Sequence, residues 1–386
     1  MLAERRRNMR VNNIEYSCYR NLRQVQLSFS HGVNVLYGMN AQGKSNILEG
    51  IYYFARGRSF RGVRDRDLVM FGEAAARFSI EFVRGISDAP ITLTAALPAS
   101  GKKKLYRNGA PLRGSAEMLG AFRAVLFCPS HLSIVNGGPA ERRAFLDIAI
   151  AQNSQSYIYY LSNYRRFLAE RNALLKRYSQ GVRVSAEEWE TYAAQLSRTA
   201  AEIYAERRAY CDALTEDVSE YFREMTGERE KPSLKYTSHL DISESGEELF
   251  DEKEATAESL YTRLTTNIDR ESAAGSTLWG PHKDDIHITL NGKEARLFAS
   301  QGQQRSIALS MKLAEGEFSR RVSGEYPVFL LDDVFSELDE SRRRFIMDKL
   351  KGRQIIVTSC EPSVVPTANA DGDIAYFEVK GGEVFP

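Results

Sequence analysis

Eight residues near the front of the chain have the composition and spacing of a phosphate-binding loop. They follow the pattern G-x-x-x-x-G-K-[ST] and are Gly38, Met39, Asn40, Ala41, Gln42, Gly43, Lys44 and Ser45. The apolar run before the loop predicts a buried strand, and the apolar-periodic sequence after it predicts a helix. Glycines let successive backbone N–H groups point at phosphate oxygens, and the helix adds its positive end. The loop therefore predicts binding of a nucleoside triphosphate.

Two side chains at the end of this loop have separate roles in phosphate chemistry. Lys44 supplies a positive charge for the β- and γ-phosphates, and the Ser45 hydroxyl is a hard oxygen ligand for Mg²⁺. Asn46, the next residue, is a further nucleotide-binding candidate. The alternative, a Gly-rich turn followed by Lys-Ser by chance, leaves the flanking strand and helix unexplained.

A pair of carboxylates follows a second apolar strand, in the segment YPVFLLDDVFSELD. Asp332 and Asp333 stand at the C-terminal end of this strand, where ligands bind in open α/β sheets. One carboxylate can hold Mg²⁺, and the other can deprotonate a water that attacks the γ-phosphate. Alone, the segment fits a strand that ends in an acidic turn. The phosphate loop in the same chain favours the catalytic interpretation.

A third motif, LFASQGQQRS, marks the start of a long predicted helix. Ser300 and Gln303 fit a capping box, which is a sufficient structural explanation for both. Gly302 is different, because a glycine destabilises the first turn of a helix unless something must approach the backbone closely. A phosphate docked on the helix start would be such a group. Since the first loop already wraps the triphosphate, this second site is most useful if it comes from another copy of the chain.

The remaining sequence predicts an α/β protein with a helical insertion. Strand-like alternation dominates the first hundred residues, and Asn108-Gly109 and Asn291-Gly292 predict hairpin turns. An acidic, Ser-rich tract over 241–258 predicts a solvated loop or helix face. Other elements are predicted by periodicity: helices over 139–178, 185–225 and 301–321, and strands over 327–331 and 353–360. One sheet-based domain is thus assembled from both ends of the sequence.

Composition bounds the classes of protein that need to be considered. The 386 residues are 43% hydrophobic and 27% charged, and the net charge is +1, so any DNA affinity must come from local patches. No apolar run has the length of a membrane span, and the first ten residues do not resemble a secretory signal. Met9 is a candidate natural start. Four widely spaced cysteines predict reduced thiols in a cytoplasm and argue against a zinc site.

The order of the motifs resembles that of ABC-type ATPase heads, in which they are called Walker A, signature, Walker B and D-loop. The segments RNLRQVQLSFSHGVNVLYGMNAQGKSN, GGPAERRAFLD, GPHKDD and SQGQQRS are similar to those of the RecF family of bacterial DNA replication and repair proteins. The resemblance implies a P-loop NTPase sheet core with an inserted helical lobe. The expected domains are an N-terminal ATPase part, a helical lobe and a C-terminal ATPase part, over 9–137, 138–274 and 275–386.

The resemblance also implies a mechanism and partners. Members of the family dimerise on ATP, bind DNA at gaps and duplex–single-strand junctions, and act with RecR and RecO to place RecA. Asp332 would then help to hold Mg²⁺, and Asp333 would be the catalytic carboxylate beside Lys44. The signature residues acting on the other subunit's ATP would be Ser300, Gly302 and Gln303, and the D-loop residues would be Ser336 and Asp339. The chain departs from the family pattern at Ser130 and His131, where two acids are usual, so any nucleotide sensing by those acids is in doubt.

Several basic clusters could bind the DNA backbone, which is recognised without regard to base sequence. The main candidates are Arg56, Arg58, Arg61, Lys102, Lys103 and Lys104, with Arg64, Arg66, Arg142 and Arg143 as further members. For each cluster the alternative is a solvated face, and the arginines after the phosphate loop could equally serve the nucleotide. His282, in GPHKDD, is predicted to be structural rather than catalytic.

Three other protein classes share part of this pattern. A transporter ATPase subunit usually carries an LSGGQ-like signature, whereas this chain reads ASQGQQ. A chromosome-scaffold head would need hundreds of heptad residues between the motifs. A small-molecule kinase would have no use for the helix start at Ser300, so dimerisation on ATP distinguishes it from an ABC-type head.

Overall fold

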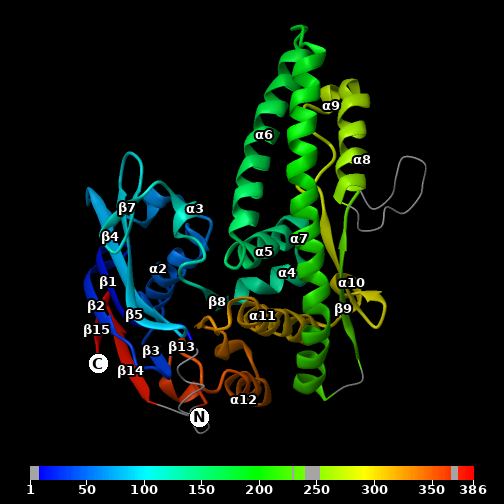
Figure 1. The fold of residues 1–386 in the computed structure, drawn as a ribbon. Helices are drawn as coiled ribbons and strands as arrows, with labels where there is room; N and C mark the ends of the chain where they lie inside the picture. Colours follow the sequence, from blue (N-terminus) through cyan, green and yellow to red (C-terminus); the bar gives the residue numbers. More distant parts are fainter. Residues whose placement is uncertain (1–7, 228–229, 240–252, 367–372) are drawn as a thin grey trace. The chain divides into compact units, whose positions relative to one another are not determined.

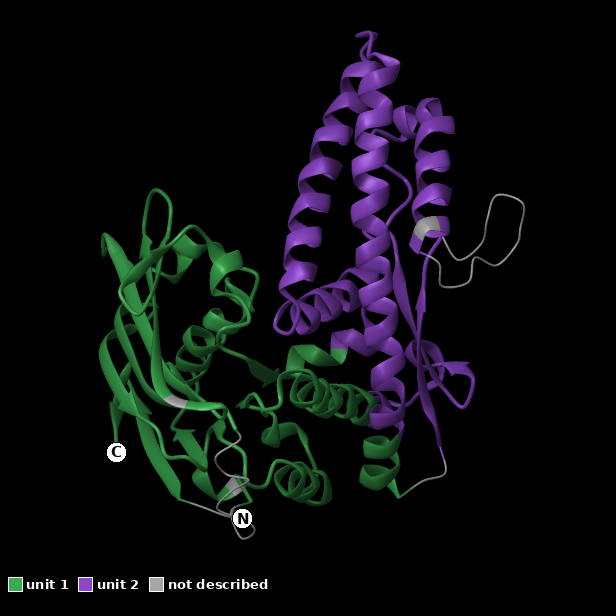
Figure 2. Cartoon of the chain, in the orientation of Figure 1, with its two compact units in different colours: residues 1–132, 220–229, 305–386 green, residues 133–219, 230–304 purple. Residues whose placement is uncertain are grey.

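The chain divides into two compact units, each built from segments that are distant in the sequence (Figure 2). The computed structural model describes residues 8–227, 230–239, 253–366 and 373–386. Unit 1 comprises 1–132, 220–229 and 305–386, and unit 2 comprises 133–219 and 230–304. The predicted domain ranges, 9–137, 138–274 and 275–386, stay a prediction; the two compact units have other boundaries. Most of the acidic tract at 241–258 lies outside the described residues.

Alternating apolar side chains in the first part of unit 1 form an antiparallel sheet with the strand order β2-β1-β4-β5-β6-β7 (Figure 1). Val11, Ile14 and Tyr16 of β1 are buried, as a half-covered sheet requires. The predicted turn at Asn108-Gly109 joins the last two strands, and both residues have positive φ. The strands are β1 Arg10–Tyr19, β2 Leu22–Ser28, β4 Ala75–Arg84, β5 Ser87–Pro98, β6 Lys104–Arg107 and β7 Ala110–Leu112.

A second sheet of unit 1 has the order β15-β14-β3-β13-β12-β8, and its strands are parallel except for β15 at one edge. Its central strands are mainly apolar and are buried at every position except Tyr37, as expected for a sheet that is covered on both faces. The predicted strands before the phosphate loop and before the two aspartates are therefore confirmed. The strands are β3 Val33–Tyr37, β8 Ala124–Phe127, β12 Val328–Asp332, β13 Ile355–Ser359, β14 Ile374–Lys380 and β15 Glu383–Phe385.

Helices of unit 1 pack on these sheets, and α2, Lys44–Arg56, lies between them in the view of Figure 1. At Gly50 of α2 a β-carbon would lie 2.3 Å from Cε1 of Tyr16 on β1, so only glycine allows this close approach. A core cluster that includes Phe329, Leu331 and Val357 covers the parallel sheet. The other helical segments are α3 Ser115–Met118, α12 Glu340–Lys349, η1 Asp65–Leu68, η2 Pro129–Leu132, η3 Phe335–Glu337 and η4 Pro362–Val364, with parts of two long helices described next.

Unit 2 is mainly helical, and two long helices, α7 Ala186–Thr226 and α11 Gln301–Ser323, run from it into unit 1. The single helical stretch predicted over 139–178 is wrong in one respect: it is broken at 152–154. Ser154 caps the second helix by accepting a hydrogen bond from Tyr157 N at 3.1 Å. The other elements are α4 Ser133–Asn136, α5 Pro139–Ala151, α6 Gln155–Ser179, α8 Lys253–Thr266, α9 Ile268–Ala274, α10 Ala295–Phe298, and a sheet of β9 Pro232–Thr237, β10 Asp285–Leu290 and β11 Lys293–Glu294.

Buried polar side chains tie the helices of unit 2 to the segment that carries GPHKDD. Arg171 of α6 is fully buried and pairs with Glu271 of α9 at 2.5 Å. His282 contacts the Tyr164 hydroxyl at 2.6 Å and the Thr277 carbonyl at 3.0 Å, which agrees with the structural role predicted for it. Of the helices described, none has the length and apolar character to cross a membrane.

Candidate nucleotide-binding site

The phosphate loop connects β3 to α2 and adopts backbone angles that glycine favours. Gly38 has φ of 142°, and a β-carbon there would lie 2.4 Å from the carbonyl oxygen of Val379. Gly43, with φ of 118°, is the N-cap of α2. Ala41 also has a positive φ of 65°, which is uncommon for a residue with a side chain. These angles produce the tight curl that the glycine spacing predicted.

The loop is fixed from outside by segments that sequence reasoning missed. Gln42 Oε1 accepts from Gly381 N at 2.6 Å, and Gln42 O accepts from Gly382 N at 3.0 Å. Asn21, in the turn between β1 and β2, donates to Gln42 O at 2.9 Å and accepts from Asn46 at 2.8 Å. The strained loop is thus held by a hairpin turn near each end of the sequence.

Lys44 lies at the start of α2 with its ammonium group turned back over the loop. Its Nζ donates to the carbonyl oxygens of Gly38 at 2.5 Å and Met39 at 2.8 Å. The side chain is buried, whereas Met39 is 78% exposed. The positive charge is therefore concentrated inside the curl of the loop, where phosphate oxygens would bind.

The two predicted Mg²⁺ ligands are in contact. The Ser45 hydroxyl is hydrogen-bonded to the Asp332 carboxylate, and Thr358 Oγ1 donates to Asp332 Oδ1 at 2.9 Å. Burial raises the pKa of Asp332, while the hydrogen bonds from Ser45 and Thr358 oppose that shift. A hydroxyl and a carboxylate beside a phosphate loop are the hard oxygen donors that Mg²⁺ prefers, so these residues fit the ion.

Asp333, the predicted catalytic carboxylate, has an unusual backbone conformation. Its φ is 51°, its N–H donates to Thr358 Oγ1 at 2.9 Å, and its carbonyl accepts from Ser336 at 2.8 Å. Thr358 therefore supports both aspartates. The sequence feature that could have pointed to Thr358 is its place as a polar residue near the C-terminal end of an apolar strand. In the structure this strand, β13, is the neighbour of β12, and Thr358 pairs with Asp332.

The two D-loop candidates, Ser336 and Asp339, form hydrogen bonds with residues close to them in the sequence. Ser336 supports the backbone of Asp333, as described above, and Asp339 caps α12 by accepting from Arg342 N at 2.9 Å. Hydrogen bonds from Ser341 and from the backbone of Arg342 lower the pKa of Asp339 to about 2. This carboxylate is thus ionised and serves the start of α12.

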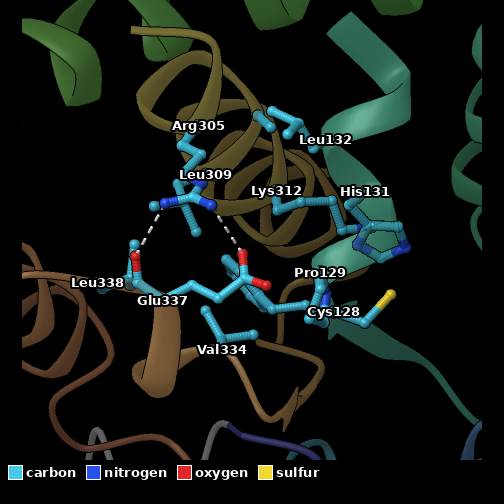
Figure 3. A pocket seen from close by; sticks show the side chains of 12 residues that line it. Cys128, Pro129, His131, Leu132, Arg305, Leu309, Lys312, Val334, Glu337 and Leu338 are labelled. Carbon is cyan, nitrogen blue, oxygen red and sulfur yellow. Dashed lines mark hydrogen bonds and ion pairs between the residues drawn. The ribbon is translucent and has the colours of Figure 1, made fainter. Parts of the chain in front are cut away.

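A small hollow of about 40 Å³ lies beside the D-loop, lined by η2, α11 and residues 334–338 (Figure 3). Arg305 of α11 pairs with Glu337 at its rim. His131, one of the two residues that depart from the family pattern, points to Lys312 in this view. Burial, and then the charges of Lys312 and Arg56, lower the pKa of His131 well below its ordinary value. His131 therefore contributes a neutral imidazole to the lining of this hollow at neutral pH.

The signature residues lie in unit 2, and the predicted capping box is confirmed. Ser300 N donates to Gln303 Oε1 at 2.7 Å, and Gln303 N donates to Ser300 Oγ at 3.2 Å. Gly302 lies in the first turn of α11. The Gln303 amide group also donates to both carboxylate oxygens of Glu230, at 2.8 and 3.0 Å.

The basic residues after the phosphate loop have different surroundings. Arg61 donates to Asn46 at 2.9 Å and lies 3.6 Å from the carboxylate of the buried Glu49. Its charge also opposes the rise in the pKa of Asp332, so Arg61 faces the nucleotide loop. Arg56 is half-buried and donates to Ser59 O at 3.3 Å, whereas Arg58 is exposed.

The basic residues of the lysine cluster and of α5 also differ in whether their charges are already bonded to the protein. Lys103 donates to Tyr53 at 3.0 Å and to Gly57 O at 2.8 Å, and it pairs with Asp65 at 3.0 Å. Lys102 and Lys104 are exposed. Arg142 and Arg143 bind groups of unit 2: Arg142 pairs with Asp285, and Arg143 donates to Asp284 O.

Comparison with known proteins agrees with this geometry. A family model described as RecF/RecN/SMC N terminal domain matches residues 10–381. A DNA replication and repair protein RecF from Clostridium novyi (strain NT) is 35% identical over 377 residues, which cover 97% of this chain and 99% of the relative. The corresponding protein of Heliobacterium modesticaldum is 37% identical over 350 residues, covering 90% and 91%.

Solved structures lead to the same family. The recombination mediator protein RecF-ATPrS in the RecFOR pathway matches with a TM-score of 0.89 and 34% identity, covering 98% of each chain. An Smc head domain from Pyrococcus furiosus, at 17% identity and a TM-score of 0.55, covers 97% of this chain and 95% of its own, and it shares the fold alone. The predicted α/β fold of an ABC-type ATPase head is confirmed. The chain therefore belongs to the RecF family of DNA replication and repair proteins.

Proposed function

We propose that this chain is an ATP-dependent DNA-binding protein of replication and recombinational repair, in which two copies close around ATP and clamp DNA. The observation that carries the nucleotide part is the contact between Ser45 and Asp332 beside the curled loop. The names of the relatives support the DNA part. Weak hydrolysis acts as a switch that reopens the dimer, and the protein works in the cytoplasm.

In the nucleotide site, the loop 38–45 and Asn46 bind the triphosphate, and Lys44 neutralises part of its charge. Ser45 and Asp332 hold Mg²⁺, which when bound supplies charge neutralisation at the phosphates. Asp333 orients the attacking water and accepts its proton. Thr358 keeps both aspartates in place during this step, because its hydroxyl donates to the Asp332 carboxylate and accepts from the Asp333 N–H.

The second half of each site comes from the other copy. Ser300 and the first N–H groups of α11, including that of Gly302, contact the γ-phosphate that the partner's loop holds. Each charge-assisted hydrogen bond contributes on the order of 1.5–3 kcal/mol, so a phosphate that bridges two chains can drive dimerisation. Hydrolysis removes these contacts, and the dimer opens.

The DNA surface of the proposed clamp includes the exposed candidates Arg58, Lys102 and Lys104. Their charges are available to the phosphate backbone, whereas Lys103 is held by unit 1. The clamp prefers gaps and duplex–single-strand junctions, and with RecR and RecO it places RecA on gapped DNA. These partners are proposed from the family, because solved structures of one member are described as belonging to the RecFOR pathway.

Fluorescence anisotropy of a labelled gapped duplex tests the clamp. We expect tight binding with ATP and Mg²⁺ and weak binding without ATP. Ser300→Arg should abolish ATP-dependent binding while still binding ATP, because its own loop is intact. Ser179→Arg, at an exposed position at the end of α6, adds the same charge away from the motif and should bind like wild type. DNA binding that ignored ATP, or that survived Ser300→Arg, would refute the clamp.

A further inference from the structure

Glu230 lies beside the first turn of α11, the helix that carries the signature residues. Its carboxylate accepts hydrogen bonds from the side-chain amide group of Gln303. A primary amide has two N–H donors, and Gln303 directs its donors to the two oxygens of one carboxylate, at 2.8 and 3.0 Å. Its Oε1 accepts from Ser300 N at 2.7 Å. The amide therefore has no donor left for a phosphate while Glu230 holds it.

The backbone next to Glu230 is anchored to a neighbouring hairpin turn. Lys231, the next residue, donates its N–H to Asn291 Oδ1 at 2.8 Å, and Asn291 N donates to Lys231 O at 3.0 Å. Asn291 belongs to the predicted hairpin turn between β10 and β11. Glu230 thus adjoins an anchored residue just before β9. The start of α11 is anchored as well, because the Gln304 amide nitrogen lies within hydrogen-bond distance of the carbonyl oxygens of Ala295, Arg296 and Ala299.

A negative charge at this place has an electrostatic effect on anything that binds the helix start. The positive end of α11 attracts anions, and Glu230 already satisfies part of that attraction. A γ-phosphate that approaches the same helix end brings a second anion into the neighbourhood of the first. The two anions repel, and the repulsion is strong where water is excluded.

We propose that Glu230 is a positioning residue that weakens the ATP-dependent dimer, because it holds Gln303 and places a carboxylate at the helix end that the partner's ATP must approach. This inference rests on the proposed function. Its consequence is that the dimer is readily reversible: Glu230 must release the Gln303 amide, or tolerate a nearby phosphate, each time two copies close. Removing the charge should therefore make the closed dimer more stable.

The test compares the full-length chain with Glu230→Gln and Glu230→Ala. Glu230→Gln keeps an acceptor for the Gln303 amide and removes the charge, and Glu230→Ala removes both. Glu190→Gln is the matched control, because Glu190 is an exposed acid of unit 2 on α7. The dimer dissociation constant is measured by analytical ultracentrifugation with Mg²⁺ and the slowly hydrolysed analogue ATPγS. Thermal midpoints check that each variant is folded.

Both Glu230 variants should tighten the dimer by roughly tenfold, since each of two composite sites loses one repulsive charge. The gain should shrink as salt rises from about 0.05 to 0.5 M. Dimers of Glu230→Gln that match the Glu190→Gln control within about twofold, or that are weaker, would overturn the inference while leaving the clamp intact. A wild-type chain that stays monomeric with ATPγS would instead refute the proposed function, and this inference with it.

Discussion

His282 should make unit 2 sensitive to mild acid. Burial lowers the pKa of its imidazole to about 4, because the charged form would lose solvation. The hydrogen bond to the Thr277 carbonyl acts in the opposite direction and requires a proton on Nε2, so Nδ1 accepts from the Tyr164 hydroxyl. Protonation of Nδ1 would reverse that second bond, because the Tyr164 hydroxyl would then have to accept instead of donate. Three nearby cations disfavour it further: Lys283, Arg143 and Arg207.

The sign and the size of the effect follow from linkage. The unfolded chain takes up a proton at His282 below about pH 6.5, and the folded chain does so only near pH 4. The stabilising contribution is therefore complete above pH 6.5 and is lost as the pH falls from 6.5 to 4. From pH 7.5 to 5.0 the two pKa values give a loss of about 2 kcal/mol in the free energy of unfolding.

Urea unfolding of wild type and His282→Gln at both pH values isolates this contribution. Other groups titrate equally in the two proteins. The change in the free energy of unfolding with pH in wild type, minus the same change in the variant, therefore reports His282 alone. We expect wild type to lose about 2 kcal/mol more than the variant on acidification. Equal losses, or an NMR titration of the His282 ring near pH 6.5, would refute the reasoning.

Three further substitutions test other contacts. Arg171→Met should cost about 3–5 kcal/mol in urea unfolding, because it leaves the buried Glu271 carboxylate without its cation, and a second change to Glu271→Gln should restore part of the loss. Gly50→Ala should lower the thermal midpoint by an amount that corresponds to about 1–3 kcal/mol, since its methyl group would overlap the Tyr16 ring; an unchanged midpoint would contradict the packing. Lys103→Met should cost about 1 kcal/mol of stability and change DNA affinity at fixed salt by less than about twofold, and a larger loss of affinity would return Lys103 to the DNA surface.

Local sequence patterns predicted the phosphate loop and the strands around it, but they did not predict the residues that hold the loop and the strand ends in place. The phosphate loop and the strand before Asp332 follow from local patterns of glycine and apolar residues. Asn21 and Thr358 were missed because each bonds a residue more than 20 positions away in the chain, on a different strand or loop. The state of Lys103 was equally hidden, since a lysine with three partners and a solvated lysine look the same in sequence. A local sequence pattern can indicate a candidate site. The residues that hold the site in place depend on which strands become neighbours in the fold, and a local pattern does not show this.

The position of β3 has a consequence for how the protein is made. This strand lies between β13 and β14, and Gln42 is bonded to Gly381, a residue 339 positions later. A ribosome that adds about 5–20 residues per second needs roughly 15–70 s to travel that distance. Throughout that time the newly made loop has neither of its neighbouring strands. The nascent chain should thus be unable to capture ATP until synthesis is nearly finished, which keeps incomplete chains out of dimers.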